Sequence, residues 1–294
     1  MWSPKDKSAV NPKYAVKDAP HEQFDWAMRF YDQGDFQRAA DEFNRLTSAY
    51  PDSDISPEAQ YYAGRSYEEL GKYYFAFQNY QKTLDNYPYT KRMEEILERE
   101  FNIANTFQAE SEPKLMDIEL SLSLERAIEI YQKIVETNAF GPLADKSMYR
   151  MAECYRRTQK YTESIDAYEK LINDYPESSL IEEAKYQLAY TRYEASLAAE
   201  YDQEKTDEAL REFKQISMST AMPQVAEEAD KVLSELKEKK AKSLVGIAVF
   251  YEKRHKYKSA MLYYKEVVSR YPDTPSAETA SQRIEAIQPR IKEK

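Results

Sequence analysis

Residues 56–88 of the chain read SPEAQYYAGRSYEELGKYYFAFQNYQKTLDNYP. The opening Ser-Pro pair is typical of a helix N-terminus, where a capping hydroxyl precedes a proline in the first turn. Gly71 permits the left-handed backbone conformation that ends a helix, and Pro88 cannot continue a second helix. The stretch therefore predicts two helices joined by a tight turn.

The second half of this stretch contains a set of side chains that recurs along the chain. A residue near the helix start is followed by a small residue three positions later and by an aromatic residue at the seventh. The six sets are Phe36–Ala39–Phe43, Tyr73–Ala76–Tyr80, Leu124–Ala127–Tyr131, Tyr161–Ser164–Tyr168, Thr206–Ala209–Phe213 and Tyr257–Ala260–Tyr264. A single helical hairpin cannot bury its apolar face alone, so the repeats predict an all-α solenoid of stacked hairpins.

The unequal spacing of these sets predicts the organisation of the chain. Residues 1–20 contain three prolines and no helical periodicity, which indicates an extended N-terminal tether. We expect units one to three in residues 21–138, with an insertion at 108–123. Units four to six occupy residues 139–294, with an extra helix at about 224–239 before the sixth unit and a capping helix at about 275–290.

The composition excludes several classes of function. The chain has 42 basic and 52 acidic residues and a net charge of −10, which disfavours a general nucleic-acid binder. The sequence has no membrane-spanning run of 18 apolar residues. Cys154 is the only cysteine and lies at helical spacing in an apolar run, so we expect it to be buried.

Catalytic and metal-binding patterns are absent from the sequence. His21 and His255 lie far apart in the repeat order, and neither has a Cys or Ser with a supporting carboxylate at motif spacing. The chain also lacks a glycine-rich phosphate loop and a Cys/His cluster. We therefore expect a protein that is not an enzyme and that takes no metal, cofactor or small-molecule substrate.

Gly64 lies inside the first predicted helix of the hairpin at residues 56–88. Glycine inside a helix costs roughly 1 kcal/mol relative to alanine, so its presence indicates close contact between two helices. We expect Tyr67, three residues later, to fill the groove beside it.

The order of residues in each hairpin resembles the tetratricopeptide repeat. The shared features are the Gly64 and Tyr67 pair, the alanine early in the second helix, the aromatic residue four positions later and the terminal proline. At a finer level, residues 50–107 resemble BamD-type outer-membrane assembly lipoproteins. The segments that carry this likeness are Tyr50–Pro51–Asp52–Ser53, Pro57–Glu58–Ala59–Gln60–Tyr61–Tyr62, Asp85–Asn86–Tyr87–Pro88–Tyr89 and Glu98–Arg99–Glu100–Phe101.

The resemblance implies a fold and a function. It implies a right-handed α-solenoid of tetratricopeptide-like hairpins, held at the periplasmic face of the outer membrane by a lipid anchor that is missing from this chain. The implied role is a scaffold of the β-barrel assembly machinery. Such a scaffold binds unfolded outer-membrane proteins through its N-terminal groove and a barrel-assembly subunit through its C-terminal half. The alternatives are a periplasmic or cytosolic tetratricopeptide adaptor for envelope division, secretion or pilus assembly, and a regulatory repeat domain of an enzyme complex.

In a tetratricopeptide stack the first helix of each hairpin lines the concave face. With the register set by Gly64 and Tyr67, the predicted peptide-binding groove contains Phe24, Met28, Tyr31, Tyr61, Arg65 and Glu68. Aromatic rings would take apolar side chains, and the guanidinium would hold a terminal carboxylate or a backbone carbonyl. The alternative interpretation is that these rings only pack against neighbouring helices.

The insertion shows a different pattern. Met116, Ile118, Leu120, Leu122 and Leu124 alternate with polar residues, which is the periodicity of a strand. One interpretation is an exposed extended segment that contacts a partner through Met116, Ile118, Leu120 and Leu122. The other is a loop whose apolar side chains lie on the neighbouring hairpins.

Overall fold

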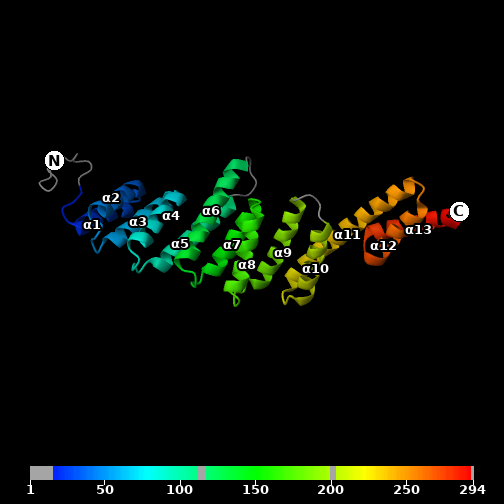
Figure 1. Cartoon of the computed structure of the whole chain (residues 1–294). Coiled ribbons are helices and arrows are strands. Elements are labelled where there is room, and N and C mark those ends of the chain that lie inside the picture. Colours follow the sequence, from blue (N-terminus) through cyan, green and yellow to red (C-terminus); the bar gives the residue numbers. More distant parts are fainter. Residues whose placement is uncertain (1–15, 111–116, 199–202, 293–294) are drawn as a thin grey trace. The chain divides into compact units, whose positions relative to one another are not determined.

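The computed structural model describes residues 16–110, 117–198 and 203–292. Within these ranges the chain forms thirteen α-helices and no strand (Figure 1). The helices are α1 (Pro20–Asp32), α2 (Phe36–Ala49), α3 (Ser56–Glu69), α4 (Tyr73–Asn86), α5 (Met93–Glu110), α6 (Asp117–Thr137), α7 (Ala144–Arg157), α8 (Tyr161–Asp174), α9 (Ile181–Ala198), α10 (Gln203–Ser219), α11 (Pro223–Lys253), α12 (Tyr257–Arg270) and α13 (Pro275–Lys292). The all-α repeat fold expected from the sequence is confirmed.

The helices form two compact units. The first unit, Met1–Thr158, contains α1 to α7, and the second, Gln159–Lys294, contains α8 to α13. In each unit, helices that follow one another along the chain pack against each other. The boundary after Thr158 reflects the contacts between helices. The boundary that we expected after residue 138 reflects the spacing of the repeats in the sequence.

Four of the turns between the two helices of a hairpin contain one residue with a left-handed backbone. Gly34 and Gly71 have φ angles of 78° and 68° between the helices of the first two hairpins. In the turns before α8 and α12, Gln159 and His255 adopt the same conformation with φ angles of 59° and 57°. Glycine adopts this conformation without steric cost, whereas Gln159 and His255 carry a penalty that the surrounding hairpin must offset.

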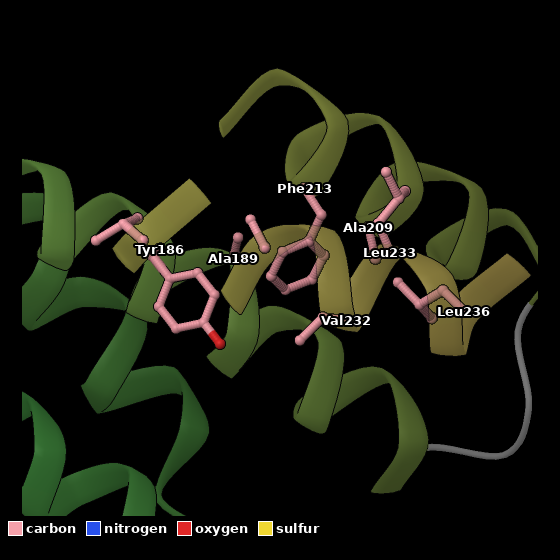
Figure 2. Packing of buried hydrophobic residues seen from close by; sticks show 9 residues of the cluster. Tyr186, Ala189, Ala209, Phe213, Val232, Leu233 and Leu236 are labelled. Atoms are coloured by element: carbon pink, nitrogen blue, oxygen red, sulfur yellow. The ribbon is translucent and has the colours of Figure 1, made fainter. Parts of the chain in front are cut away.

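The recurring side chains build the core of each hairpin. The small and aromatic members of the sets are almost completely buried, as at Ala39, Phe43, Ala76, Tyr80, Ala127, Tyr131, Ala260 and Tyr264. Figure 2 shows the equivalent Phe213 within the cluster that α9, α10 and α11 form in the second unit. Complete burial of one such ring stabilises the fold by roughly 1.5–3 kcal/mol, which explains why the pattern is repeated.

Gly64 does lie at a close helix contact, but with a different ring from the expected one. A Cβ atom at Gly64 would stand 2.6 Å from Cδ1 and Cε1 of Tyr80. Tyr67 instead packs against Phe75, with 5.7 Å between the ring centroids. The expected role of Tyr67 is therefore wrong, because the groove beside Gly64 is filled across the hairpin by α4.

The extra helix expected at 224–239 is not a separate element. It is continuous with the first helix of the sixth unit, and together they form the 31-residue helix α11. Its first half contributes Leu233 and Leu236 to the cluster around Phe213. Its second half contributes Ala241 and Ala248 to a cluster with α12 and α13. Strong helix formers at 235–242 leave no signal at which α11 could break.

The strand periodicity in the insertion is contradicted from residue 117 onward, where α6 begins. Leu120 and Leu124 are also four residues apart, and they continue into the helical series of Ala127 and Tyr131. Within α6, Leu124 is buried while Leu122 is 48% exposed. Ile118 and Leu120 lie on α6, and Met116 lies outside the described residues.

Candidate peptide-binding surface of the N-terminal unit

Two of the three groove residues expected on α1 contact an aromatic side chain of α3, and the third packs against the same core cluster. Phe24 and Tyr31 meet Tyr62 edge-on, with ring centroids 6.0 and 5.4 Å away, and Met28 packs against the same cluster. All three are half-buried. Sequence reasoning did not select Tyr62, although it follows Tyr61 directly and its ring is the one that joins α1 to α3.

Tyr61 is placed at the junction of α3 and α5 with only 1% of its surface exposed. Its Oη donates a hydrogen bond of 2.5 Å to Glu95 Oε1. The same oxygen accepts hydrogen bonds from Arg65 Nη1 at 3.3 Å and Arg99 Nε at 3.2 Å. The guanidinium of Arg92 covers the ring at 4.8 Å. For Tyr61 the packing interpretation therefore holds, and the ring does not face a ligand.

The exposed part of this surface is a network of arginine and glutamate side chains. Arg92 pairs with Glu58 and Glu95 at 3.2 and 2.8 Å. Arg99 pairs with Glu68 and Glu95 at 3.3 and 3.2 Å. We call Glu58, Arg65, Glu68, Glu69, Arg92, Glu95 and Arg99 the α3–α5 charge network.

The charged groups of the network remain partly accessible. Arg65 pairs with Glu69 at 3.2 Å and has 22% of its side chain exposed, and Arg92 has 34%. Burial alone would raise the pKa of Glu95, but the hydrogen bonds from Tyr61, Arg92 and Arg99 lower that pKa to about 2. Glu95 therefore stays ionised at neutral pH. The network presents both guanidinium donors and carboxylate acceptors to solvent.

Five members of the network were not selected as groove residues from the sequence, and three of these lie at or near the start of one helix. Arg92, Glu95 and Arg99 lie at or near the start of α5, at spacings of three and four residues that put side chains on one helix face. That spacing was a usable signal. The spacing does not predict which helix supplies the partner side chains, because the pairing with Glu58 and Glu68 depends on how successive repeats stack.

Glu68 has a structural role that recurs in the second unit. It accepts a 2.5 Å hydrogen bond from the buried Tyr80 Oη and pairs with Arg99. Burial and the nearby Glu68 carboxylate raise the pKa of Tyr80, so its hydroxyl remains a donor. Glu252 binds Tyr264 and Arg283 in the same way, and the sequence separations of 12 and 31 residues are identical.

These two arrangements are clamps that each join three helices. One carboxylate on the first helix of a hairpin holds the tyrosine of its own second helix and an arginine of the next repeat. Glu68 is therefore committed to holding α3, α4 and α5 together, and it is less available to a ligand than Arg65 or Arg92.

The polar surface continues from α5 to α7. Tyr131 Oη lies 2.7 Å from Asn105 Oδ1 and 3.0 Å from Gln108 Oε1, and its one hydrogen is shared between these two acceptors. Gln108 Nε2 donates in turn to Glu153 on α7. Aromatic, amide and charged groups thus follow one another across α1, α3, α5 and α7, a mixture that suits an extended peptide with polar and apolar side chains.

The sequence matches two family models. Residues 120–292, more than half of the chain, match the model described as outer membrane lipoprotein and named YfiO. The chain belongs to this family. In addition, residues 24–89 match a tetratricopeptide-repeat model. The resemblance to BamD-type lipoproteins is confirmed, although the match to this YfiO family covers the later repeats rather than the segment 50–107 that carried it.

The chain is similar to several solved structures at low sequence identity. A tetratricopeptide-repeat protein of Thermus thermophilus is 15% identical, with 73% of this chain and 99% of that chain covered and a TM-score of 0.38. One from Parabacteroides merdae is 15% identical, with coverages of 90% and 97% and a TM-score of 0.36. No curated protein matches the sequence.

The family and the repeats define a coarse function. Tetratricopeptide hairpins form a protein-interaction module, and the chain is an adaptor of this type. None of the described helices is long and apolar enough to cross a membrane. In the described ranges there is also no group of three or more His, Cys, Asp or Glu side chains suited to a metal ion.

Proposed function

We propose that this YfiO-family chain is a non-enzymatic scaffold of the machinery that inserts β-barrel proteins into the outer membrane. It acts at the periplasmic face of that membrane, held there by a lipid anchor. The observation that carries the proposal is the family match over residues 120–292 together with tetratricopeptide repeats over residues 24–89.

The two units of the chain bind different partners. The α3–α5 charge network and the aromatic cluster around Tyr62 bind an extended segment of an unfolded barrel protein. A guanidinium such as Arg65 binds the carboxylate or the backbone carbonyls of that segment, and neighbouring rings accept its apolar side chains. The helices of the second unit bind the periplasmic domains of the barrel subunit.

The role in the machinery is tested by co-purification. We expect the full chain to retain the periplasmic domains of a barrel-assembly subunit, and a chain truncated after residue 158 to lose them. Thr158 ends the first compact unit, and circular dichroism of the truncated chain verifies that this unit folds alone. Failure of the full chain to bind would contradict the assignment to this machinery and leave a general adaptor.

The peptide surface is tested by replacing its accessible arginines. Arg65→Gln combined with Arg92→Gln is expected to weaken binding of a C-terminal barrel-strand peptide about tenfold, since a lost hydrogen bond to a charged group costs roughly 1.5–3 kcal/mol. Fluorescence anisotropy with a labelled peptide measures the change. Tyr61 is not substituted, because it is buried and its replacement would destabilise the fold. Lost binding and lost stability could then not be distinguished.

A matched control exists in the same unit. Arg45 pairs with Glu42 on α2 and has 25% of its side chain exposed, close to the 22% of Arg65, but it lies outside the network. Arg45→Gln is expected to leave peptide affinity unchanged. Equal affinity in the Arg65/Arg92 double variant and the wild type, with equal melting temperatures, would show that the peptide binds elsewhere.

A further inference from the structure

Five loops within the described parts of the chain contain the same turn. Each loop connects the second helix of a hairpin to the next repeat, and in each the N–H of the fourth residue donates to the carbonyl of the first. The five bonds are Ser53 to Tyr50, Thr90 to Tyr87, Gly141 to Asn138, Ser178 to Tyr175 and Thr274 to Tyr271. The backbone therefore gives the third residue of every turn an equivalent position.

The third residue differs between the turns in a systematic way. It is acidic in three of them, namely Asp52, Glu177 and Asp273. In the two remaining turns it is aromatic, and these follow one another in the first unit. Tyr89 is 98% exposed and Phe140 is 97% exposed.

The fold does not require these two rings. A polar residue suits the third position of such a turn, as the three acidic examples demonstrate. An aromatic ring left in water forgoes the roughly 1.5–3 kcal/mol that its burial would contribute. A single exposed ring is ordinary on a protein surface, but the same substitution in two consecutive repeats indicates a contact outside the chain.

Hydrogen bonds and helix packing put these turns on one edge of the first unit. Tyr50 Oη donates to the carbonyl of Lys17 at 2.6 Å, and Tyr87 Oη donates to the carbonyl of Pro51 at 3.1 Å. Helices α5 and α6 pack against each other as a hairpin, so the loop before α5 lies beside the loop after α6. We call residues 50–55, 87–92 and 138–143 the turn edge.

The charge around the two rings differs from that of the whole chain. Although the chain has a net charge of −10, residues 87–92 and 138–143 include no acidic residue. Lys91, two residues after Tyr89, is exposed, and so is Lys146, which follows Asp145 in the first turn of α7. The acidic residues of the turn edge, Asp52 and Asp54, are confined to its first segment. Exposed rings with nearby lysines are suited to the boundary between acyl chains and anionic headgroups of a lipid bilayer.

We propose that the turn edge lies on a lipid bilayer with Tyr89 and Phe140 inserted at the level of the headgroups. The chain enters α1 at this same edge, because Lys17 is bonded to Tyr50. A lipid anchor upstream, which is part of the proposed function, would hold this edge near the membrane. Arg92 belongs to both the turn edge and the α3–α5 charge network, whereas the two inserted rings lie outside that network.

The insertion of the rings is tested with tryptophan as a depth probe. The full chain is attached through an N-terminal histidine tag to vesicles of phosphatidylethanolamine and phosphatidylglycerol that contain a nickel-chelating lipid. Tyr89→Trp and Phe140→Trp are each compared with the parent chain, which has two tryptophans, Trp2 and Trp26. We expect lipids brominated on the acyl chain to quench the new fluorescence at both positions at least threefold more than in the control.

The control is Leu70→Trp, in the turn between α3 and α4 at the opposite end of those helices. Leu70 is 36% exposed, and we expect little quenching there. Equal quenching at all three positions, or none at residues 89 and 140, would overturn the proposal.

A second experiment separates lipid from a protein partner. Tyr89→Asp with Phe140→Asp restores the residue type of the other turns, and we expect vesicle partitioning of the untagged chain to fall about tenfold with no change in melting temperature. Asp52→Asn, at the equivalent position, serves as the control and should not weaken partitioning. If the double variant retains vesicle binding but loses the barrel-assembly subunit, the edge is a protein interface and the proposal is wrong.

Discussion

Gly64→Ala is expected to lower the free energy of unfolding by about 2 kcal/mol, although alanine is the better helix former. The added methyl group would stand 2.6 Å from two ring atoms of Tyr80. Tyr80 cannot move aside easily, because its ring is fully buried and its hydroxyl is bonded to Glu68. Overpacking of this kind typically costs 1–3 kcal/mol, which exceeds the gain in helix propensity.

Chemical denaturation of the purified chain measures this change, and a second glycine provides its control. Gly246 lies inside α11, is exposed and would place its Cβ in open space. Gly246→Ala should therefore raise stability by roughly 0.5–1 kcal/mol. The two substitutions are chemically identical and are expected to have opposite signs. A stabilising effect at Gly64 would mean that the α3–α4 contact is looser than the structure indicates.

Glu100→Gln is expected to remove a pH dependence of stability that the wild-type chain shows between about pH 5 and pH 8. Glu100 is fully buried on α5, and both of its carboxyl oxygens accept hydrogen bonds from Gln81 Nε2 at 2.9 and 3.0 Å. Burial raises the pKa of Glu100 to about 8, the Gln81 hydrogen bonds oppose this rise, and the Asp85 charge adds to it.

The direction of the effect follows from proton linkage. Because the pKa is higher in the folded state than in the unfolded state, the folded chain retains a proton that the unfolded chain releases above about pH 4.5. The contribution of Glu100 to stability is thus complete at low pH and is lost as the pH rises towards 8, at about 1.4 kcal/mol per pH unit. A glutamine at this position keeps the shape of the protonated acid and has no proton to lose.

Urea denaturation at several pH values measures this effect. The difference in unfolding free energy between Glu100→Gln and the wild type should shift in favour of the variant by a few kcal/mol between pH 5 and pH 8. Glu98→Gln, at an exposed position of the same helix, is the control and should give a nearly constant difference. Parallel curves for Glu100→Gln and the wild type would mean that Glu100 is ionised in the folded chain.

The sequence predicted the helices because their periodicity and their turn residues are local signals. The small and aromatic positions that it selected, such as Ala76 and Tyr80, are those that the core buries. It was wrong about Tyr67, because the choice between Tyr67 and Tyr80 depends on how two helices cross. It was also wrong about residues 117–124, where alternating leucines satisfy both strand and helix periodicity and the packing of Leu124 decides between them.

The candidate site was less predictable than the fold for the same reason. Phe24, Met28 and Tyr31 do lie together, but the ring that joins them, Tyr62, was not selected. Tyr61 was selected as an open groove residue and is instead covered by Arg92. Such pairings link residues more than thirty positions apart in consecutive repeats. The register in which consecutive repeats stack cannot be predicted from a single sequence.

The continuity of α11 determines how the second unit can move. At 1.5 Å per residue its 31 residues form a rod on the order of 45 Å long. The apolar clusters at its two ends are therefore joined by an unbroken ladder of backbone hydrogen bonds rather than by a hinge. Bending between the two clusters would require backbone hydrogen bonds of the helix to break. A partner that binds both ends of α11 therefore meets two surfaces at a fixed distance, and little conformational entropy of this chain is lost on binding.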